Sequence, residues 1–247
     1  MYDDARRRDA LQLLSTGMTL SEVSRRTGVA RSTIRTWRDH APAPAPCPRC
    51  GSGDLPQPEY AALLGFYLGD GCLSVLERTT ALRISCDASL PGIVADVTRT
   101  VRAVHPSRPC FHVRAPGTTV VQSSWKHWPC LFPQHGPGRK HDRRIVLEPW
   151  QRSLVEEHPG AFLRGLFHSD GSRVRNWASR RVAATGEVRR HDYARWQFTN
   201  RSEDILGLCG WALDLVEVPW RRSSVTTMSV SRRAAVARLD TLIGEKR

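Results

Sequence analysis

The chain has 247 residues, with 37 Lys and Arg against 24 Asp and Glu, which leaves a formal net charge of +13. This length allows one large domain or two modest ones. No apolar run approaches the ~20 residues that a membrane span needs, and the first ten residues lack the apolar segment of a signal peptide. These features exclude a membrane-spanning protein, so we expect a cytoplasmic chain with no membrane partner.

The excess of positive charge predicts a polyanionic partner. Nucleic acid is the most economical choice, and an anionic membrane surface or an acidic protein is the alternative. A nucleic-acid partner would place the chain on the nucleoid. The seven cysteines are an odd number, so we expect reduced thiols or metal ligands rather than a framework of disulfides.

The segment 3–39 is predicted to form three short helices. Gly28 stands where the second helix should end, and Thr19 with Glu22 has the spacing by which side chains satisfy the free amides of a helix start. A short helix, the turn "TGVA" and a third helix rich in Arg, Ser and Thr resemble the helix-turn-helix of resolvases and transposases. A plain three-helix packing or protein-interaction unit is the alternative.

In a helix-turn-helix the third helix enters the major groove of DNA. The resemblance therefore implies that residues of the third helix contact bases or phosphates. These residues are Arg31, Ser32, Thr33, Arg35 and Arg38.

A Pro-alternating string, "APAPAP" at 41–46, follows the helices and is predicted to be an extended spacer. Directly after it, Cys47 and Cys50 have the Cys-x-x-Cys spacing of a zinc knuckle. Zinc needs four ligands, so a structural zinc here would be completed by distant Cys or His residues or by a second chain. The alternative is a degenerate knuckle with two idle thiols.

From residue 59 onward the chain contains two similar halves. "LLGFYLGDG" at 63–71 matches "LRGLFHSDG" at 163–171, and each is followed by a strand hairpin, a helix, two more strand-like runs and a closing helix. With a shift of 114, the segment 83–85 aligns with 197–199 in the second hairpin. The chain is therefore predicted to hold two αββαββα repeats and to be an α+β protein.

The two matched segments are predicted to pack as a pair of helices. Gly65 and Gly69 lie four residues apart, as do Gly165 and Ser169, and small residues at this spacing let two helix backbones approach closely. Such packing brings the helix ends together.

Asp70 and Asp170 would then be neighbours, each followed by a glycine suited to a left-handed helix cap, Gly71 or Gly171. Two carboxylates at the negative ends of helix dipoles repel each other and favour a divalent cation such as Mg²⁺. A metal held there can activate water against a phosphodiester. We therefore predict Asp70 and Asp170 as catalytic residues and metal ligands; the alternative is buried helices with capped ends and no metal.

These paired segments resemble the signature helices of LAGLIDADG homing endonucleases in the single-chain, two-repeat form. The resemblance covers about residues 59–247 and implies a pseudo-twofold saddle of two antiparallel sheets on duplex DNA, with one chain binding as a monomer through its internal pseudo-twofold. The paired helices would lie at the centre, with the acids near the scissile phosphates. The strand residues implied for base contact are Arg83, Ser85, Gln197 and Thr199.

The second motif departs from the family pattern at Arg164 and His168. The basic residue that family members often place near the attacking water is not fixed by the motif, and our candidate is Lys140 in "QHGPGRKHDRR". An exposed basic connector explains that loop equally well. Neighbouring arginines predicted to contact the DNA backbone are Arg139, Arg143 and Arg144.

Two functions remain open from the sequence. The first is metal-dependent cleavage of double-stranded DNA, and the second is a non-cleaving, sequence-specific transcriptional regulator built on the same fold. The expected organisation is a helix-turn-helix domain at 1–40, a Pro-rich linker with the Cys-x-x-Cys knuckle at 41–58, a first repeat at 59–135, a basic connector at 136–158 and a second repeat at 159–247.

Overall fold

The computed structural model describes residues 4–39, 47–51, 53–106, 109–181 and 186–246. These residues divide into two compact units, Met1–Asp54 and Leu55–Arg247. The Pro-rich segment predicted at 41–46 lies outside the described residues. Within the described part of the chain, no helix has the length and apolar character to cross a membrane.

The first unit contains the three predicted helices, α1 (Asp4–Ser15), α2 (Leu20–Thr27) and α3 (Arg31–Asp39). The expected start of α2 is present, since the backbone amide of Thr19 donates to Glu22 Oε2 at 2.8 Å and the amide of Glu22 donates to Thr19 Oγ1 at 3.3 Å. Gly28 ends α2 with φ 69°, a left-handed conformation that suits glycine. Val23 and Ile34 are fully buried between the helices.

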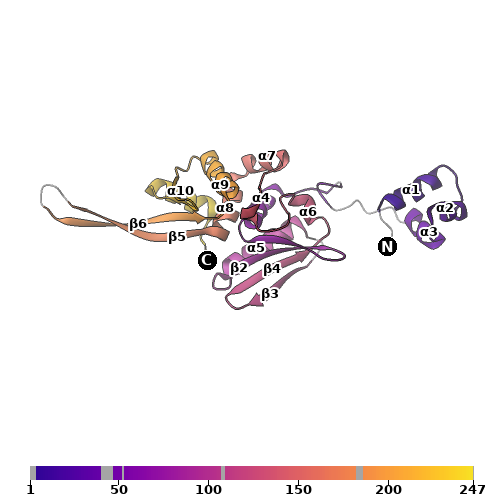
Figure 1. The fold of residues 1–247 in the computed structure, drawn as a ribbon, viewed down its shortest axis with the longest axis horizontal. Coiled ribbons are helices and arrows are strands. Elements are labelled where there is room, and N and C mark those ends of the chain that lie inside the picture. The colour runs from indigo at the N-terminus through magenta and orange to yellow at the C-terminus, as the bar shows by residue number, and fades with distance from the viewer. Residues whose placement is uncertain (1–3, 40–46, 52, 107–108, 182–185, 247) are drawn as a thin grey trace. The chain divides into compact units, whose positions relative to one another are not determined.

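The second unit contains two repeats with the same order of elements (Figure 1). The first repeat and the connector contain α4 (Gln57–Leu68), β1 (Gly71–Val75), β2 (Thr80–Asp87), α5 (Pro91–Val104), β3 (Cys110–Ala115), β4 (Thr118–Ser124), α6 (Trp128–Leu131), the short 3₁₀ helix η1 (Lys140–Asp142) and α7 (Pro149–Glu157). The second repeat contains α8 (Pro159–Asp170), β5 (Gly171–Arg181), β6 (Val188–Thr199), α9 (Glu203–Leu215), β7 (Arg221–Ser224), β8 (Thr227–Val230) and α10 (Arg233–Ile243).

Each repeat forms one four-stranded antiparallel sheet. The strand orders are β1-β2-β4-β3 and β5-β6-β8-β7, so the second sheet repeats the topology of the first. This arrangement confirms the predicted α+β fold with a duplicated αββαββα unit.

The two faces of each sheet differ in polarity because successive strand residues point to opposite sides. In β2, Ile84 is 1% exposed and belongs to the core that the helices cover. In β6, Phe198 is fully buried in the equivalent place. The residues on either side of these two positions therefore point to the face that the helices leave uncovered.

Helices α4 and α8 pack through direct contact of their backbones. A Cβ atom added at Gly165 would lie 2.1 Å from the carbonyl oxygen of Ala62, and one added at Gly65 would lie 2.4 Å from the carbonyl oxygen of Phe162. Nearer the helix ends, a Cβ at Gly69 would lie 2.4 Å from the Cβ of Ser169. The close approach predicted from the spacing of small residues is confirmed.

The left-handed caps predicted at Gly71 and Gly171 are wrong. Gly171 has φ −90° and ψ 152°, an extended conformation, and Gly71 is not among the glycines of positive φ. The need for glycine is steric instead, because an added Cβ would lie 2.5 Å from the Cα of Tyr67 or from the carbonyl oxygen of Phe167. The chain turns from helix to strand too sharply for a side chain.

We predict that Gly165→Ala destabilises the second unit by about 3 kcal/mol, because the new methyl group must push two helix backbones apart. Gly207→Ala in α9 is the matched control, since nothing lies within 4 Å of its added Cβ. It should stabilise the fold by about 0.5–1 kcal/mol through helix propensity. Urea denaturation followed by tryptophan fluorescence reports on this unit, since Trp37 is the one tryptophan outside it. Equal effects of the two substitutions would contradict the packing described here.

Candidate active site

The ends of α4 and α8 carry one acid each. Asp70 follows α4 and Asp170 ends α8, in both cases immediately before the chain enters a strand. The helices pack so closely that a Cβ at Gly69 would lie 3.3 Å from Asp170 Oδ2. The structure therefore brings the two predicted acids to one place, where Asp70 is more exposed than Asp170.

The two carboxylates are in an unfavourable environment for negative charge. Burial and then the neighbouring charge of Asp70 raise the pKa of Asp170 to about 6. Burial also raises the pKa of Asp70, against the lowering effect of two lysines. Burial and mutual repulsion disfavour the ionised forms of both acids, and a cation placed between them would stabilise those forms.

The two acids are not equivalent. Asn200 Nδ2 donates a hydrogen bond to Asp170 Oδ2 at 2.7 Å, which holds one oxygen of that carboxylate. The corresponding residue of the first repeat, at the shift of 114, is Cys86, whose sulfur lies 3.9 Å from the carbonyl oxygen of Ile84. Asn200 was not predicted, although its place directly after the predicted strand 197–199 was a signal that could have identified it.

Lys140 lies at the end of α4. Its Nζ donates to the carbonyl oxygens of Tyr67 at 2.7 Å, Leu68 at 2.8 Å and Gly71 at 2.9 Å, and also to that of Gly69. Burial lowers the pKa of Lys140 to about 8, although the charges of both acids act in the opposite direction. The structure thus brings Lys140, predicted from its Gly-Pro-Gly loop, next to the paired acids.

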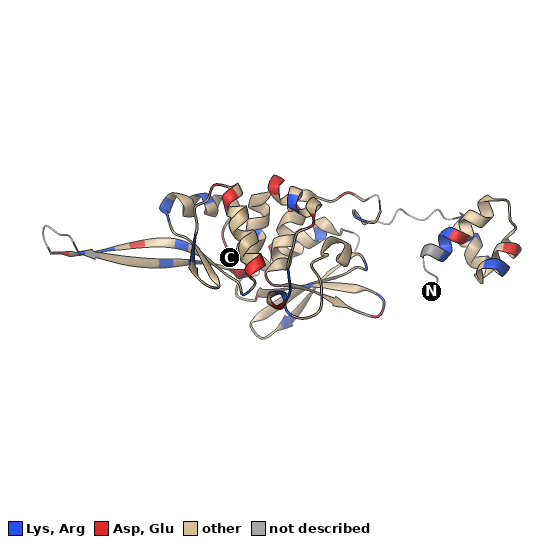
Figure 2. Ribbon diagram, turned by 45° about the horizontal axis from the view of Figure 1, so that its top comes forward, with Lys and Arg blue, Asp and Glu red and all other residues tan. Residues whose placement is uncertain are grey.

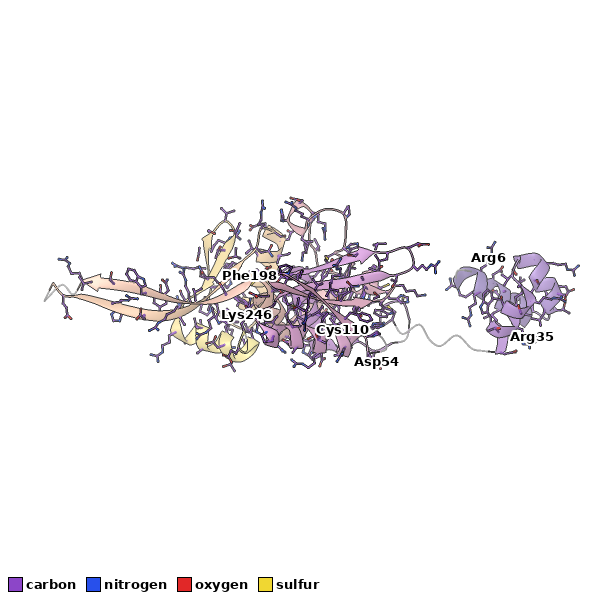
Figure 3. The ribbon with its side chains drawn as sticks, turned by 90° about the horizontal axis from the view of Figure 1, so that it is seen from below. Arg6, Arg35, Asp54, Cys110, Phe198 and Lys246 are labelled. Carbon is purple, nitrogen blue, oxygen red and sulfur yellow. The ribbon has the colours of Figure 1, made fainter. Side chains whose placement is uncertain are left out.

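Lys246 occupies the equivalent place at the end of α8. Its Nζ donates to the carbonyl oxygens of Phe167 at 3.3 Å, Ser169 at 3.0 Å and Gly171 at 2.6 Å. Burial lowers its pKa as well. Lys246 was not predicted, although the rarity of lysine, with three in the chain, was a signal that could have identified it. Figure 3 labels Lys246.

Each of the two acids lines a cavity. The first has a volume of about 540 Å³, and the residues lining it include Lys140, Asp170 and Asn200. The second has a volume of about 390 Å³, and its lining includes Asp70 and Lys246. Each cavity therefore combines the acid of one helix with the lysine that binds the end of the other helix.

The four strand residues predicted to contact bases lie on the uncovered faces of the sheets. Arg83 and Ser85 flank the buried Ile84, and Gln197 and Thr199 flank the buried Phe198. Ser85 and Thr199 are exposed, while Arg83 and Gln197 are half-buried.

The three arginines beside Lys140 differ in their surroundings. Arg143 bonds within its own loop, with Nη1 donating to the carbonyl oxygen of Gly138 at 2.7 Å and Nε to that of Gln134 at 3.3 Å. Arg139 and Arg144 are exposed. The loop therefore presents two of these arginines to solvent and uses the third to hold its shape.

The two departures from the family motif share one partner. Arg164 Nη2 donates to Asp96 Oδ1, and His168 Nδ1 lies 3.6 Å from Asp96 Oδ2. Asp96 belongs to α5 of the first repeat and is 5% exposed. Arg164 and His168 therefore join α8 to the first repeat, and they leave the acidic end of the motif intact.

The predicted DNA-contact residues of the first unit lie on α3. Ser32, Arg35 and Arg38 are exposed, and Figure 3 labels Arg35. Arg31 is exposed and its Nη1 donates to Ser21 Oγ at 3.4 Å. Thr33 is half-buried.

All seven cysteines are free of disulfides. In the first unit, Cys47 and Cys50 stand in a turn closed by the amide of Gly51, which donates to the carbonyl oxygen of Cys47 at 2.9 Å. In the second unit, His127 and Cys130 have the same spacing, and the Cys130 sulfur lies 3.9 Å from His127 Nδ1. This second pair was not predicted from the sequence.

A family model described as a homeodomain-like domain matches residues 1–41, in agreement with the predicted helix-turn-helix. A search of curated proteins finds no match. Solved structures similar to this chain include LAGLIDADG homing endonucleases and a LAGLIDADG domain, the family that the two acidic motifs resemble.

I-DmoI in complex with DNA and Ca is 14% identical and covers 76% of this chain and 91% of its own, with a TM-score of 0.48. The N-terminal LAGLIDADG domain of DUF199/WhiA is 15% identical, covers 77% of this chain and 83% of its own, and has a TM-score of 0.46. The homing endonuclease I-WcaI bound to its DNA recognition sequence is 12% identical. It covers 76% of this chain and 81% of its own, with a TM-score of 0.47.

The raised pKa of Asp170 predicts a pH-dependent stability of the metal-free protein. Its pKa is about 6 in the fold against an ordinary value of 3.8, so its contribution to stability is fully present below about pH 4 and is lost as the pH rises through 6. Asp170→Asn should therefore match wild type at pH 4 and exceed it at pH 8 by up to about 3 kcal/mol. Urea denaturation in EDTA at both pH values measures this difference.

The exposed Asp142 of η1 provides the control. Asp142→Asn should leave the pH dependence of the unfolding free energy as in wild type. If Asp170→Asn keeps the wild-type pH dependence as well, neither burial nor the charge of Asp70 raises the pKa of Asp170 in the folded protein.

Proposed function

We propose that the chain binds double-stranded DNA and cleaves it with the help of a divalent cation. The observation that carries this proposal is the meeting of Asp70 and Asp170 at the packed ends of α4 and α8, each beside a cavity with a lysine. A protein that only binds DNA gains nothing from two carboxylates held together near phosphates, because they weaken binding unless a cation neutralises them.

The donor atoms at this place fit a hard divalent cation. Asp70 and Asp170 supply carboxylate oxygens, and the raised pKa of both acids reflects an environment that disfavours their negative charge, which a cation would relieve. Mg²⁺ takes a few such oxygens and keeps several waters. When bound, the ion would supply an activated water and stabilise the charge that develops on the phosphate.

The protein's own groups have distinct tasks in this proposal. Asp70 and Asp170 hold the cation, and the amide of Asn200 fixes the position of one oxygen of Asp170. Lys140 and Lys246 each place a positive charge beside the acids, where it attracts a phosphate and stabilises negative charge on it. Lys140, with its pKa lowered to about 8, can also exchange a proton near neutral pH.

The DNA contacts divide between the two units. In the second unit we propose base contacts by Arg83, Ser85, Gln197 and Thr199, and backbone contacts by Arg139, Arg143 and Arg144. The pseudo-twofold repeat lets one chain act as a monomer on DNA. The α3 residues of the helix-turn-helix at 1–40 add a second contact through the linker at 41–58, and this partner would place the chain on the nucleoid. The repeats are assigned to 59–135 and 159–247, joined by the basic connector at 136–158.

A transcriptional regulator that binds DNA without cutting it is the second candidate. The observation that favours it is the N-terminal unit, because residues 1–41 match a homeodomain-like model and modules of this kind recognise DNA sequence through one helix. Cleavage does not require such a unit. The two candidates predict different effects of removing one acid.

We predict that Asp70→Asn or Asp170→Asn lowers the cleavage rate at least about a hundredfold and leaves duplex binding equal or tighter, since a repulsive charge is removed. The wild-type protein is incubated with a randomised duplex library and Mg²⁺, and the new DNA ends are sequenced. Specific ends should occur with wild type and disappear with either variant.

Asp142→Asn is the control, because it removes an exposed acid of the same loop as Lys140 and should keep the wild-type ends. If the wild-type protein binds a defined duplex tightly without Mg²⁺ and produces no ends, the regulator is the correct function. If it binds no duplex, both candidates fail.

We also propose a structural zinc ion with Cys47 and Cys50 as two of its ligands. The two cysteines stand in one turn, closed by the amide of Gly51, and Cys-x-x-Cys is the spacing of a zinc knuckle. A structural zinc takes four ligands, so this turn supplies half of the set.

Purified wild-type protein should contain about one zinc per chain, and the variant with Cys47→Ser and Cys50→Ser should contain none. A variant with Cys72→Ser and Cys110→Ser is the control and should keep it. Metal analysis of the three proteins decides the question, and equal zinc contents in all of them would overturn the proposal.

A further inference from the structure

The hairpin of the second repeat extends far beyond its sheet. β5 and β6 pair from Gly171↔Phe198 to Arg181↔Val188, but β8 pairs with β6 only from Trp196 to Thr199. The eight pairs from Val174↔Arg195 outward therefore form a two-stranded ribbon without a neighbouring strand. Figure 1 shows this ribbon projecting away from the helices of its repeat. We call it the β5–β6 arm.

The described residues of the first repeat form no such arm. β1 and β2 form only the five pairs from Gly71↔Ile84 to Val75↔Thr80, and β4 pairs with β2 over its whole remaining length, from Ala81 to Asp87. The two repeats are otherwise alike in strand order. The arm is therefore an addition to one half of a pseudo-twofold structure.

The arm is basic and lacks a core. Between residues 174 and 195 the sequence has six arginines and two acidic residues, and Figure 2 shows basic residues along both strands. Trp177 is 55% exposed and Val188 is 58% exposed. An isolated two-stranded ribbon is marginally stable in water, so side-chain pairs between its strands must hold this one.

Cross-strand pairs of this kind are present. The guanidinium of Arg190 lies 5.1 Å from the ring centre of Trp177, and Asn176 Nδ2 donates to Tyr193 Oη at 2.9 Å. Across the ribbon, Arg175 Nη2 lies 3.5 Å from Asp192 Oδ2, and within β6 Arg190 Nε donates to Asp192 Oδ1 at 3.1 Å. The cross-strand pairs hold the two strands together, and the two arginines offset the charge of Asp192.

One face of the arm continues the surface proposed to contact bases. Alternate residues of a strand share a face, so Arg195, Tyr193 and His191 follow Gln197 along the uncovered side of the sheet. The major groove of B-DNA is wide enough to admit a two-stranded ribbon. Eight residue pairs at about 3.3 Å each span roughly 26 Å. This is close to the length of about eight base pairs of B-DNA, which rise about 3.4 Å each.

We propose that the β5–β6 arm lies in the major groove of duplex DNA beyond the central site, on the side of the second repeat only. This inference rests on the proposed DNA binding and adds to it an asymmetric footprint. The arginines of the arm contact phosphates, and the exposed edges of the ribbon are covered by the groove. Exposed strand edges can instead pair with a second copy of the chain, which charged side chains on the edge discourage. Pairing with a second copy is therefore the competing explanation that the test must separate.

The test compares the wild-type chain with a shortened variant in which an Asn-Gly turn replaces residues 176–193. This turn joins Arg175 to Ala194, which already face each other across the ribbon, and Asn-Gly favours a two-residue hairpin. The deleted segment has four arginines and two acidic residues. The control variant, Arg233→Gln with Arg238→Gln, therefore removes the same net charge from exposed positions on α10. All three proteins carry Asp70→Asn so that the DNA stays intact.

Hydroxyl-radical footprints are measured on duplexes selected from the randomised library. The shortened variant should lose protection of roughly six base pairs at one end only, since six residue pairs span about 20 Å. On a mixed-sequence duplex, its plot of log affinity against log salt should also become less steep, by about 0.9 for each phosphate that the arm no longer neutralises. The control variant should keep the wild-type footprint.

Several results would overturn the inference. They are an unchanged footprint in the shortened variant, an equal loss at both ends, or the same change in the control variant. A loss of self-association in sedimentation, with DNA affinity unchanged, would show that the arm pairs with a second copy instead. If the unshortened protein binds no duplex at all, the proposed function fails first and the inference fails with it. Unchanged thermal unfolding of the shortened variant confirms that its sheet is intact.

Discussion

The backbone contact between α4 and α8 is the constraint on which the rest of the second unit depends. Gly65 and Gly165 allow the helices to touch without side chains between them, and this contact joins the two repeats along the pseudo-twofold. It also forces the ends of both helices together. The acids at those ends then share a small volume, where burial raises the pKa of both, so the packing that stabilises the fold creates an electrostatic cost at the site.

Two lysines offset part of this cost. Lys140 and Lys246 come from unrelated parts of the sequence, yet each donates to the carbonyl oxygens at the end of one helix. A cation at a helix C-terminus interacts favourably with the helix dipole. The same charges lie beside the acids and the cavities, so groups that hold the helix ends are also available to a bound phosphate.

Part of this arrangement could be predicted from the sequence. The repeated Asp-Gly motifs and the small residues four apart predicted the helix pair and its acids, because both signals are local and occur twice. Lys246 and Asn200 were missed because their roles depend on distant contacts. The left-handed caps were wrong because the chain turns directly into a strand, and glycine is needed there for space rather than for positive φ. In the sequence, the extra length of the β5–β6 arm was visible only as the growth of the offset between the two halves, from 100 at Asp70 and Asp170 to 114 at the segments 83–85 and 197–199.

The central claim is that the paired acids form one cation site that faces DNA. Its most direct test is a calorimetric titration of Ca²⁺ into the metal-free chain with a mixed-sequence duplex present, compared with the double variant Asp70→Asn, Asp170→Asn. We predict saturable binding to wild type that is lost in the double variant, while both proteins still bind the duplex. Equal Ca²⁺ binding by the two proteins, or none by either, would contradict it.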